Sequence, residues 1–173
     1  MFIISAVGRD RPGMAHALAQ TLFEAGCNLE DTTMTRLSGE FAMILIVSPP
    51  PGLELSALQA KLSALEASHG LWVSLRQVAD EDQLSQTARA RFIVTAYGPD
   101  NAGLLARMAG AFAQHGVNLT DVQTRVAGEA YVMLFEVEAP PELSEDELRA
   151  AVNQAAQQIG VSATVRALEE DVL

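Results

Sequence analysis

The sequence predicts an α+β fold in which one β-α-β-β-α-β unit occurs twice in tandem, each copy a four-stranded antiparallel sheet with two helices on one face. Residues 2–31 align with residues 92–121 without a gap. Apolar residues recur at helix and strand spacings, and glycines and prolines separate these segments. The matches include turn residues, which indicates a duplicated fold: Phe2–Phe92, Ile3–Ile93, Ala6–Ala96, Gly8–Gly98, Asp10–Asp100, Gly13–Gly103, Ala19–Ala109, Gly26–Gly116, Asn28–Asn118, Leu29–Leu119 and Asp31–Asp121.

Each copy begins with a strand and an amphipathic helix. The first strands are "FIISAV" and "FIVTAY", and a helix is expected from about Gly13 to Ala25 and over the matching part of the second copy. Gly26 and Gly116 end these helices, where a left-handed residue is favoured. One apolar stripe runs along each helix at i, i+4 and i+8, consisting of Met14, Leu18 and Leu22 in the first copy and of Leu104, Met108 and Phe112 in the second.

The remaining elements are a hairpin, a second helix and a last strand. A strand from Asn28 to about Leu37 leads through a tight turn at Gly39, matched by Gly128, into "FAMILIV" or "YVMLFEV". The alignment predicts a one-residue slip where "LSGE" meets "VAGE". Prolines at 49–51 and 140–141 end these strands. Helices are expected at 55–68 and 145–158. The last strands are "LWVSLRQV" in the first copy and "VSATVRAL" in the second. This order is the ferredoxin-like arrangement.

The domain boundaries follow from the repeat. Residues 1–79 form the first domain, the polar segment 80–90 is the linker, and residues 91–173 form the second domain. Cys27 is the only cysteine, so no disulfide forms within the chain. Neither a signal peptide nor an apolar run long enough to span a membrane is visible, so we expect a soluble, cytoplasmic protein without membrane association.

Charge and motifs exclude several function classes that this fold carries. The formal net charge is −11, with 11 lysines and arginines against 22 acids, which argues against direct binding of nucleic acid. "FAMILIV" has one aromatic residue and no charge, unlike an RNA-recognition strand. No Cys-x-x-Cys is present for metal transfer. "RDRPG" is only loosely similar to an arginine-rich phosphate loop, and "PDNAG" lacks the arginine.

One motif occurs at the same place in both copies. An aspartate precedes a glycine at the start of the first helix, and "CNLED" or "VNLTD" follows that helix. The pair "DRPG" and "GCNLED" resembles the signature of the ACT domain, the small-molecule-sensing module of amino acid metabolism, over nearly the whole chain. Two copies without an attached enzyme resemble the glycine cleavage system transcriptional repressor family, whose first repeat is close to "GRDRPG…GCNLEDTTMTRLSGEF".

The resemblance implies a site for a small amino acid, glycine or serine, between paired domains near the glycine at the start of the first helix. A helix N-terminus offers unpaired N–H groups to a carboxylate, glycine lets a ligand approach the backbone, and an asparagine both donates and accepts hydrogen bonds. By resemblance one half-site contains Asp10, Arg11, Pro12, Gly13, Met14, Asn28, Leu29 and Asp31. The other contains Asp100, Asn101, Gly103, Leu104, Asn118, Leu119 and Asp121.

Structural roles compete with ligand binding at these positions. Asp10 and Asp100 are equally explained as helix caps, Gly13 as a turn residue, and Asn28 as a partner of the local backbone. Asn101 and Ala102 replace the Arg-Pro of "DRPG" in the second copy, which weakens the case for a ligand there. The three histidines and Cys27 form no catalytic or metal-binding set, and no cofactor is expected.

Three functions remain open from the sequence. The first is a non-enzymatic regulator that senses an amino acid and, as the resemblance implies, acts on a transcriptional activator protein rather than on DNA. The second is a small enzyme or accessory subunit of amino acid or one-carbon metabolism. The third is a scaffold without a ligand that associates with itself; a homo-oligomer is expected because exposed edge strands favour pairing.

Overall fold

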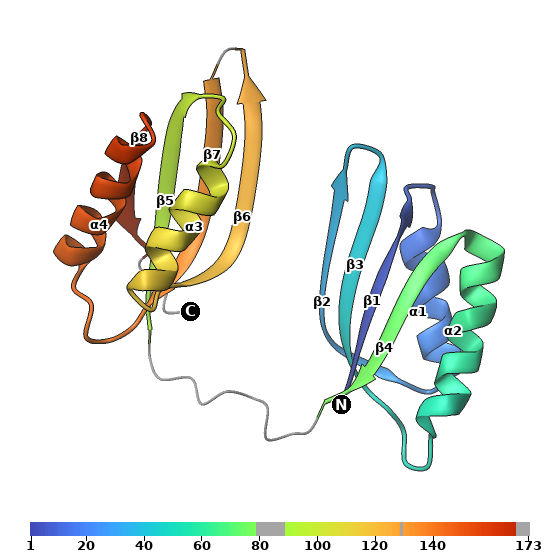
Figure 1. The fold of residues 1–173 in the computed structure, drawn as a ribbon. Coiled ribbons are helices and arrows are strands. Elements are labelled where there is room, and N and C mark those ends of the chain that lie inside the picture. Colours follow the sequence, from blue (N-terminus) through green and yellow to red (C-terminus); the bar gives the residue numbers. More distant parts are fainter. Residues whose placement is uncertain (79–88, 129, 169–173) are drawn as a thin grey trace. The chain divides into compact units, whose positions relative to one another are not determined.

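The computed structural model describes residues 1–78, 89–128 and 130–168 and divides into two compact units, Met1–Leu84 and Ser85–Leu173 (Figure 1). The first unit contains β1 (Phe2–Arg9), α1 (Met14–Glu24), β2 (Asn28–Leu37), β3 (Glu40–Ser48), α2 (Leu55–His69) and β4 (Leu71–Gln77). The second contains β5 (Ala90–Pro99), α3 (Leu104–Gln114), β6 (Asn118–Ala127), β7 (Ala130–Ala139), α4 (Glu145–Gln158) and β8 (Ser162–Ala167). The predicted linker 80–90 lies outside the described residues except at its last two positions.

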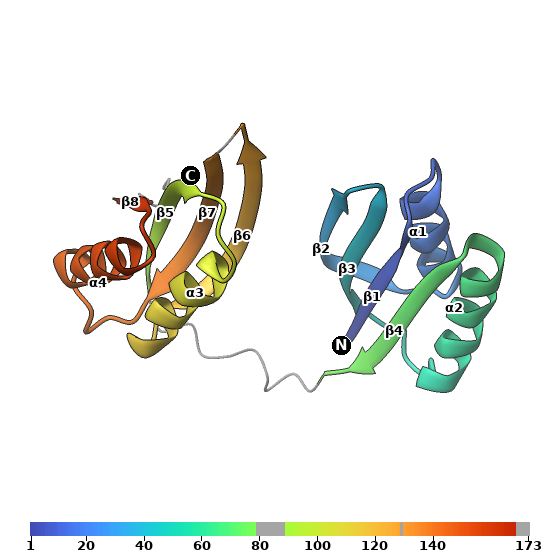
Figure 2. The same cartoon turned by 45° about the horizontal axis from the view of Figure 1, so that its top comes forward.

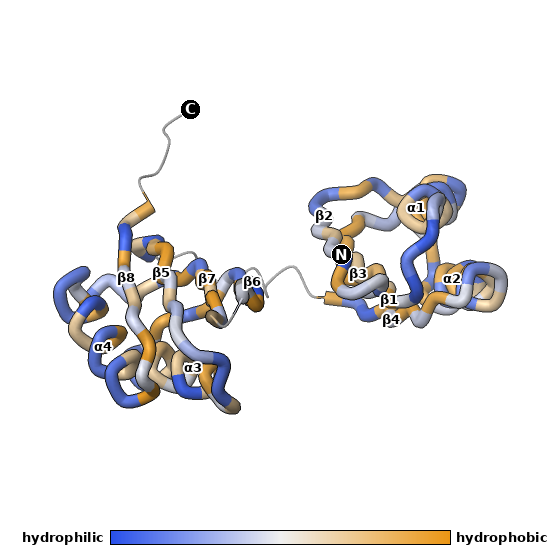
Figure 3. The backbone as a smooth tube through the Cα atoms, turned by 90° about the horizontal axis from the view of Figure 1, so that it is seen from above, coloured by the Kyte–Doolittle hydropathy of each residue, from blue (hydrophilic) through white to orange (hydrophobic). Residues whose placement is uncertain are grey.

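The predicted fold class is confirmed in both units. The strand orders are β2-β3-β1-β4 and β6-β7-β5-β8, and neighbouring strands pair antiparallel. Both helices of a unit lie on the same face of its sheet, as the two ribbon views show (Figures 1 and 2) and as the end-on view of the tube also shows (Figure 3). β2 and β6 are edge strands, joined to the sheet on one side only.

Each unit has its own hydrophobic core between the sheet and the helices. Alternate residues of the central strands point toward the helices, as the period of two requires, and the i, i+4, i+8 stripes predicted for α1 and α3 are buried. In the first unit the core includes Ile4, Leu18, Leu45, Leu58 and Leu62, each with no exposed surface. No polar side chain is buried among the described residues, so apolar burial holds each unit together.

Gly8 and Gly98 are required by close packing at the end of the central strand. A Cβ on Gly8 would lie 2.9 Å from the carbonyl oxygen of Gly70, and one on Gly98 would lie 2.6 Å from Cγ1 of Val161. Both distances are shorter than the closest non-bonded contacts that a Cβ atom makes in proteins. The glycine repeated in the sequence therefore lets the turn after the second helix pack against the first strand.

The hairpins correct one expectation from the alignment. The pairs Leu37↔Glu40 and Ala127↔Ala130 keep the same offset that carries Phe2 to Phe92, so the predicted one-residue slip is wrong. Gly128 takes the place of Ser38, and both have positive φ, 66° and 51°. The residues of a two-residue hairpin turn favour positive φ, which glycine adopts most easily. The two turns have the same length, but glycine is the second turn residue in the first copy (Gly39) and the first turn residue in the second copy (Gly128).

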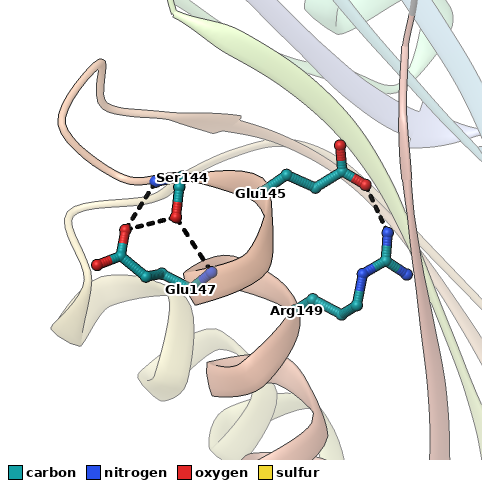
Figure 4. Close-up of polar contacts among 4 residues, drawn as sticks. All are labelled: Ser144, Glu145, Glu147 and Arg149. Carbon is teal, nitrogen blue, oxygen red and sulfur yellow. Dashed lines mark hydrogen bonds and ion pairs between the residues drawn. The ribbon is translucent and has the colours of Figure 1, made fainter.

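The start of α4 is stabilised by a capping box, which the three-residue spacing of Ser144 and Glu147 in the sequence predicts (Figure 4). The Glu147 N–H donates to Ser144 Oγ at 3.3 Å, and the Ser144 N–H donates to Glu147 Oε2 at 2.9 Å. The Ser144 hydroxyl and then its backbone N–H hold the pKa of Glu147 below its ordinary value. Arg149 pairs with Glu145 one turn along the same helix.

We predict opposite effects of alanine at two glycines of the second unit. Gly98→Ala should lower the free energy of unfolding by about 1–3 kcal/mol because its methyl group overlaps Val161. Gly110→Ala, within α3 and with open space around it, should raise it by about 1 kcal/mol because alanine favours the helix. Thermal and urea unfolding measure both, and equal effects of the two changes would contradict this packing.

We predict that Ser144→Ala lowers the free energy of unfolding by about 1 kcal/mol at neutral pH. A lowered carboxyl pKa stabilises the folded state at pH values above the ordinary glutamate pKa, about 4.3. This contribution disappears as the pH falls through the folded-state pKa. The difference between variant and wild type should therefore shrink at acid pH. Urea unfolding at a series of pH values tests this; a difference that grows on acidification would exclude the proposed hydrogen bonds.

Candidate functional site

The turn between β1 and α1 places a glycine directly before an uncapped helix. Gly13 has φ 95° and ψ −8°, and no side chain caps the N-terminus of α1. Gly103 has φ 89° and ψ 4° before α3, again without a side-chain cap. The interpretation of Asp10 and Asp100 as helix caps is therefore wrong. The N–H groups of a first helical turn carry partial positive charge that suits a carboxylate.

A hollow of about 410 Å³ opens at the start of α3. It is lined by residues of the turn, of the first turn of α3 and of β7: Asp100, Asn101, Gly103, Leu104, Leu105, Ala106 and Tyr131. It combines apolar walls with a carboxylate, an amide and a phenol. The copy that departs from "DRPG" thus has an open hollow on its surface at the predicted position.

In the first copy an ion pair lies at the equivalent turn. Asp10 Oδ2 lies 3.4 Å from Nη1 of Arg36 on β2, and the Asp10 N–H donates to the carbonyl oxygen of Gly39 at 2.8 Å. The position equivalent to Arg36 is Val126, since these residues oppose Phe41 and Tyr131 in the hairpins. Within the described part of the chain, the carboxylate of Asp100 has no ionic partner.

The asparagine segments make local hydrogen bonds at β-bulges. Asn28 Nδ2 donates to Glu30 Oε1 at 3.0 Å, and this bond, followed by one from Ser48, lowers the pKa of Glu30. Asp31 Oδ1 accepts from the Thr32 N–H at 2.7 Å. In the second copy Asp121 Oδ2 accepts from Gln123 Nε2 at 3.1 Å. Both strands are irregular here, between Leu29 and Asp31 and between their counterparts Leu119 and Asp121.

The two parts of each predicted half-site lie at opposite ends of the sheet. Asp10 follows the last residue of β1, whereas Asn28 opposes Ser48, and the adjacent Val47 opposes Phe2, the first residue of β1. The eight residues of β1 span about 26 Å. Asn118 and Asp100 are separated in the same way. One amino acid cannot contact both segments of a single unit.

The other predicted residues differ in accessibility. Met14 and Leu104 are buried in the cores at 3% exposure, so their backbone rather than their side chains faces the turn. Leu119 packs against the second core, while Leu29 is 42% exposed. The remaining turn residues are exposed: Arg11, Pro12 and Asn101.

Two residues near the turns were missed by the sequence argument. Arg36 belongs to an otherwise unremarkable polar strand, and its partner Asp10 is distant in sequence. Tyr131 could have been noticed, because a tyrosine aligns with the buried Phe41 of the first copy and its phenol needs a polar partner or solvent.

Metal and thiol chemistry find no support in the described residues. No group of three or more His, Cys, Asp or Glu side chains among them is arranged to hold a metal ion. Burial raises the pKa of the Cys27 thiol, which keeps it protonated and weakly nucleophilic. Within the described ranges no helix combines the length and the apolar character needed to cross a bilayer.

Comparisons with known proteins agree with the duplicated fold. The family model described as the ACT domain matches residues 1–76 and again residues 90–166. The glycine cleavage system transcriptional repressor of Escherichia coli (strain K12) is 24% identical over 123 residues, which are 71% of this chain and 63% of that protein. The chain therefore spans less than two thirds of this relative and of its Shigella flexneri counterpart.

Two solved structures share the fold along nearly the whole chain. A protein of unknown function from Galdieria sulphuraria has a TM-score of 0.80 and 24% identity, covering 97% of this chain and 98% of that one. A protein provisionally described as a glycine cleavage system transcriptional repressor has a TM-score of 0.79 and 19% identity, covering 98% and 97%. At these identities the likeness concerns the fold.

We predict that Gly13→Ala and Gly103→Ala each lower the free energy of unfolding by about 1–2 kcal/mol, because a left-handed backbone brings Cβ too close to the neighbouring carbonyl. Asparagine tolerates this conformation, so Gly13→Asn and Gly103→Asn should cost less. Urea unfolding of the four variants measures the effect. If alanine and asparagine proved equally costly, strain at these turns would not be its origin.

Proposed function

This chain belongs to the ACT domain family, and from that premise we propose that it is a non-enzymatic regulatory protein that senses a small amino acid. The observation that carries the proposal is the hollow at the start of α3, bounded by a positive-φ glycine and an uncapped helix. Repeated ACT domains account for nearly all of the described residues, and those residues show no metal cluster.

The hollow offers complementary groups to both ends of an amino acid. The first N–H groups of α3 can bind the α-carboxylate, and a Cβ on Gly103 would meet nothing within 4 Å, so a ligand can approach the backbone there. The carboxylate of Asp100, which has no ionic partner among the described residues, suits the ammonium group. The side chains of Leu105 and Tyr131 border the space left for a small side chain.

A second ACT domain is needed to complete such a site. The asparagine segment lies at the far end of the edge strand from the turn of its own unit. Antiparallel pairing of two edge strands reverses one of them, so the asparagine segment of one domain comes to the turn of the other. All ten residues of β2 are exposed, and an unpaired edge favours such pairing. The ligand would then bind the paired arrangement more tightly than the separate one.

The regulatory target follows from the relatives. Those in Escherichia coli and Shigella flexneri are named as repressors of the glycine cleavage system. We infer a role in transcriptional regulation of glycine cleavage, with glycine or serine as effector. With 22 acidic against 11 basic residues, the chain suits contact with a transcriptional activator protein better than contact with DNA.

We predict saturable binding of glycine or serine in titration calorimetry of the purified protein. Gly103→Asn should abolish binding at the hollow because its side chain fills the approach to α3, and Gly13→Asn tests the first copy separately. Gly160→Asn is the matched control, since that glycine also has positive φ, 71°, and open space but does not line the hollow.

Two results would contradict the sensor. One is the absence of binding by any of the amino acids while the protein is folded. The other is binding that Gly103→Asn and Gly13→Asn, singly and together, leave unchanged. A ligand-free scaffold would give the first result and an unrelated site the second.

A further inference from the structure

The two turns carry different charges although their backbones are alike. Each copy brings the tip of its hairpin beside the turn, since Arg9 opposes Glu40 and Pro99 opposes Ala130 (Figure 1). Three exposed arginines of the first copy are replaced by uncharged residues in the second: Arg9 by Pro99, Arg11 by Asn101 and Arg36 by Val126. The carboxylate of Asp10 is therefore flanked by cations at positions where Asp100 has uncharged neighbours.

Arg36 engages the group that would otherwise bind the ammonium end of an amino acid. Its Nη1 lies 3.4 Å from Asp10 Oδ2, and it opposes Phe41, which is 2% exposed. Val126 opposes Tyr131 in the same register, and Tyr131 is partly exposed and lines the hollow. Directly opposed side chains share a face of the sheet. Arg36 therefore stands beside the first turn on the face where the second copy has its open hollow.

We propose that the turn before α3 is the amino acid site of this chain, and that the hairpin residue, Val126 or Arg36, decides which turn binds. The inference rests on the proposed function and assigns its effector to one of the two turns. With Val126 at this position, the carboxylate of Asp100 has no ionic partner among the described residues and is available to an ammonium group. With Arg36 there, the carboxylate of Asp10 is already neutralised.

The ammonium end of the ligand makes the difference between the turns. Both turns offer helix N–H groups to the carboxylate end, because α1 and α3 are equally uncapped. At the first turn an ammonium group must displace Arg36 from Asp10 and is repelled by the guanidinium that it displaces. An exposed ion pair changes an equilibrium constant by up to about fivefold. With the repulsion added, we expect the first turn to bind at least about fivefold more weakly than the second.

The motif alone predicts the reverse assignment. The first copy keeps "DRPG", whereas the second has "DNAG", so the first copy is the better candidate by motif. Arg36 follows Asp10 by 26 residues, and the two meet only because strand pairing brings the hairpin tip to the turn. The residue that separates the two turns in this proposal thus lies outside the motif.

Titration calorimetry of the full chain with glycine and with serine tests the loss of the site. Val126→Arg should weaken binding at least about fivefold, because the new guanidinium pairs with Asp100 as Arg36 pairs with Asp10. This defect should shrink in high salt, which screens exposed charges, whereas simple obstruction would persist. The matched control is Thr164→Arg, which adds the same charge at an exposed position of β8 that does not line the hollow. It should bind like the wild type.

A gain of binding tests the first turn. Gly103→Asn removes binding at the hollow, and Arg36→Val added to that variant should restore saturable binding of one ligand per chain, now at the first turn. Val126 shows that the hairpin accepts valine at this position. Arg76→Val, which instead removes an exposed arginine of β4, should not restore binding. Thermal unfolding checks that each variant is folded.

Three results would overturn this inference while leaving the sensor intact. The first is binding by Gly103→Asn that is as tight as binding by the wild type. The second is unchanged binding by Val126→Arg, and the third is failure of Arg36→Val to restore binding. The absence of amino acid binding by the folded wild type would instead overturn the proposed function, and this inference with it.

Discussion

The burial of alternate side chains of the two central strands beneath two helices is the interaction on which both units depend. In the first unit Ile4 and Leu45 meet Leu18 and Leu58 without exposed surface. A pair of helices covers only one face of four strands. The edge strands, the face of each sheet away from its helices, and the turns before α1 and α3 are therefore left to solvent.

Duplication has left two versions of one scaffold that differ at these uncovered places. The first copy has the ion pair between Asp10 and Arg36 at its turn. The second has Val126 in place of the arginine and a hollow lined partly by Tyr131. Core residues are constrained by close packing, whereas exposed positions change at little cost. This allows the two turns to diverge while the two cores stay alike.

In the proposed sensor, the distance between the turn and the asparagine segment would link ligand binding to assembly. One unit cannot place both around a small molecule, because β1 and β2 run in the same direction with the segments at opposite ends. A ligand that contacts both must bridge two domains, and its binding free energy then favours the paired state. This is a physical route by which an amino acid changes what the protein contacts.

The sequence by itself determined the order of the elements, the buried stripes of α1 and α3, the capping box at Ser144 and the left-handed glycines, because these depend on residues close together in the chain. Tertiary structure decided which distant groups meet. Asp10 pairs with Arg36 instead of capping α1, Gly8 makes room for the carbonyl of Gly70, and Asn28 lies far from Gly13. Strand order and register set these distances. Both depend on pairing between strands that are far apart in the chain, which the spacing of residues within one segment does not specify.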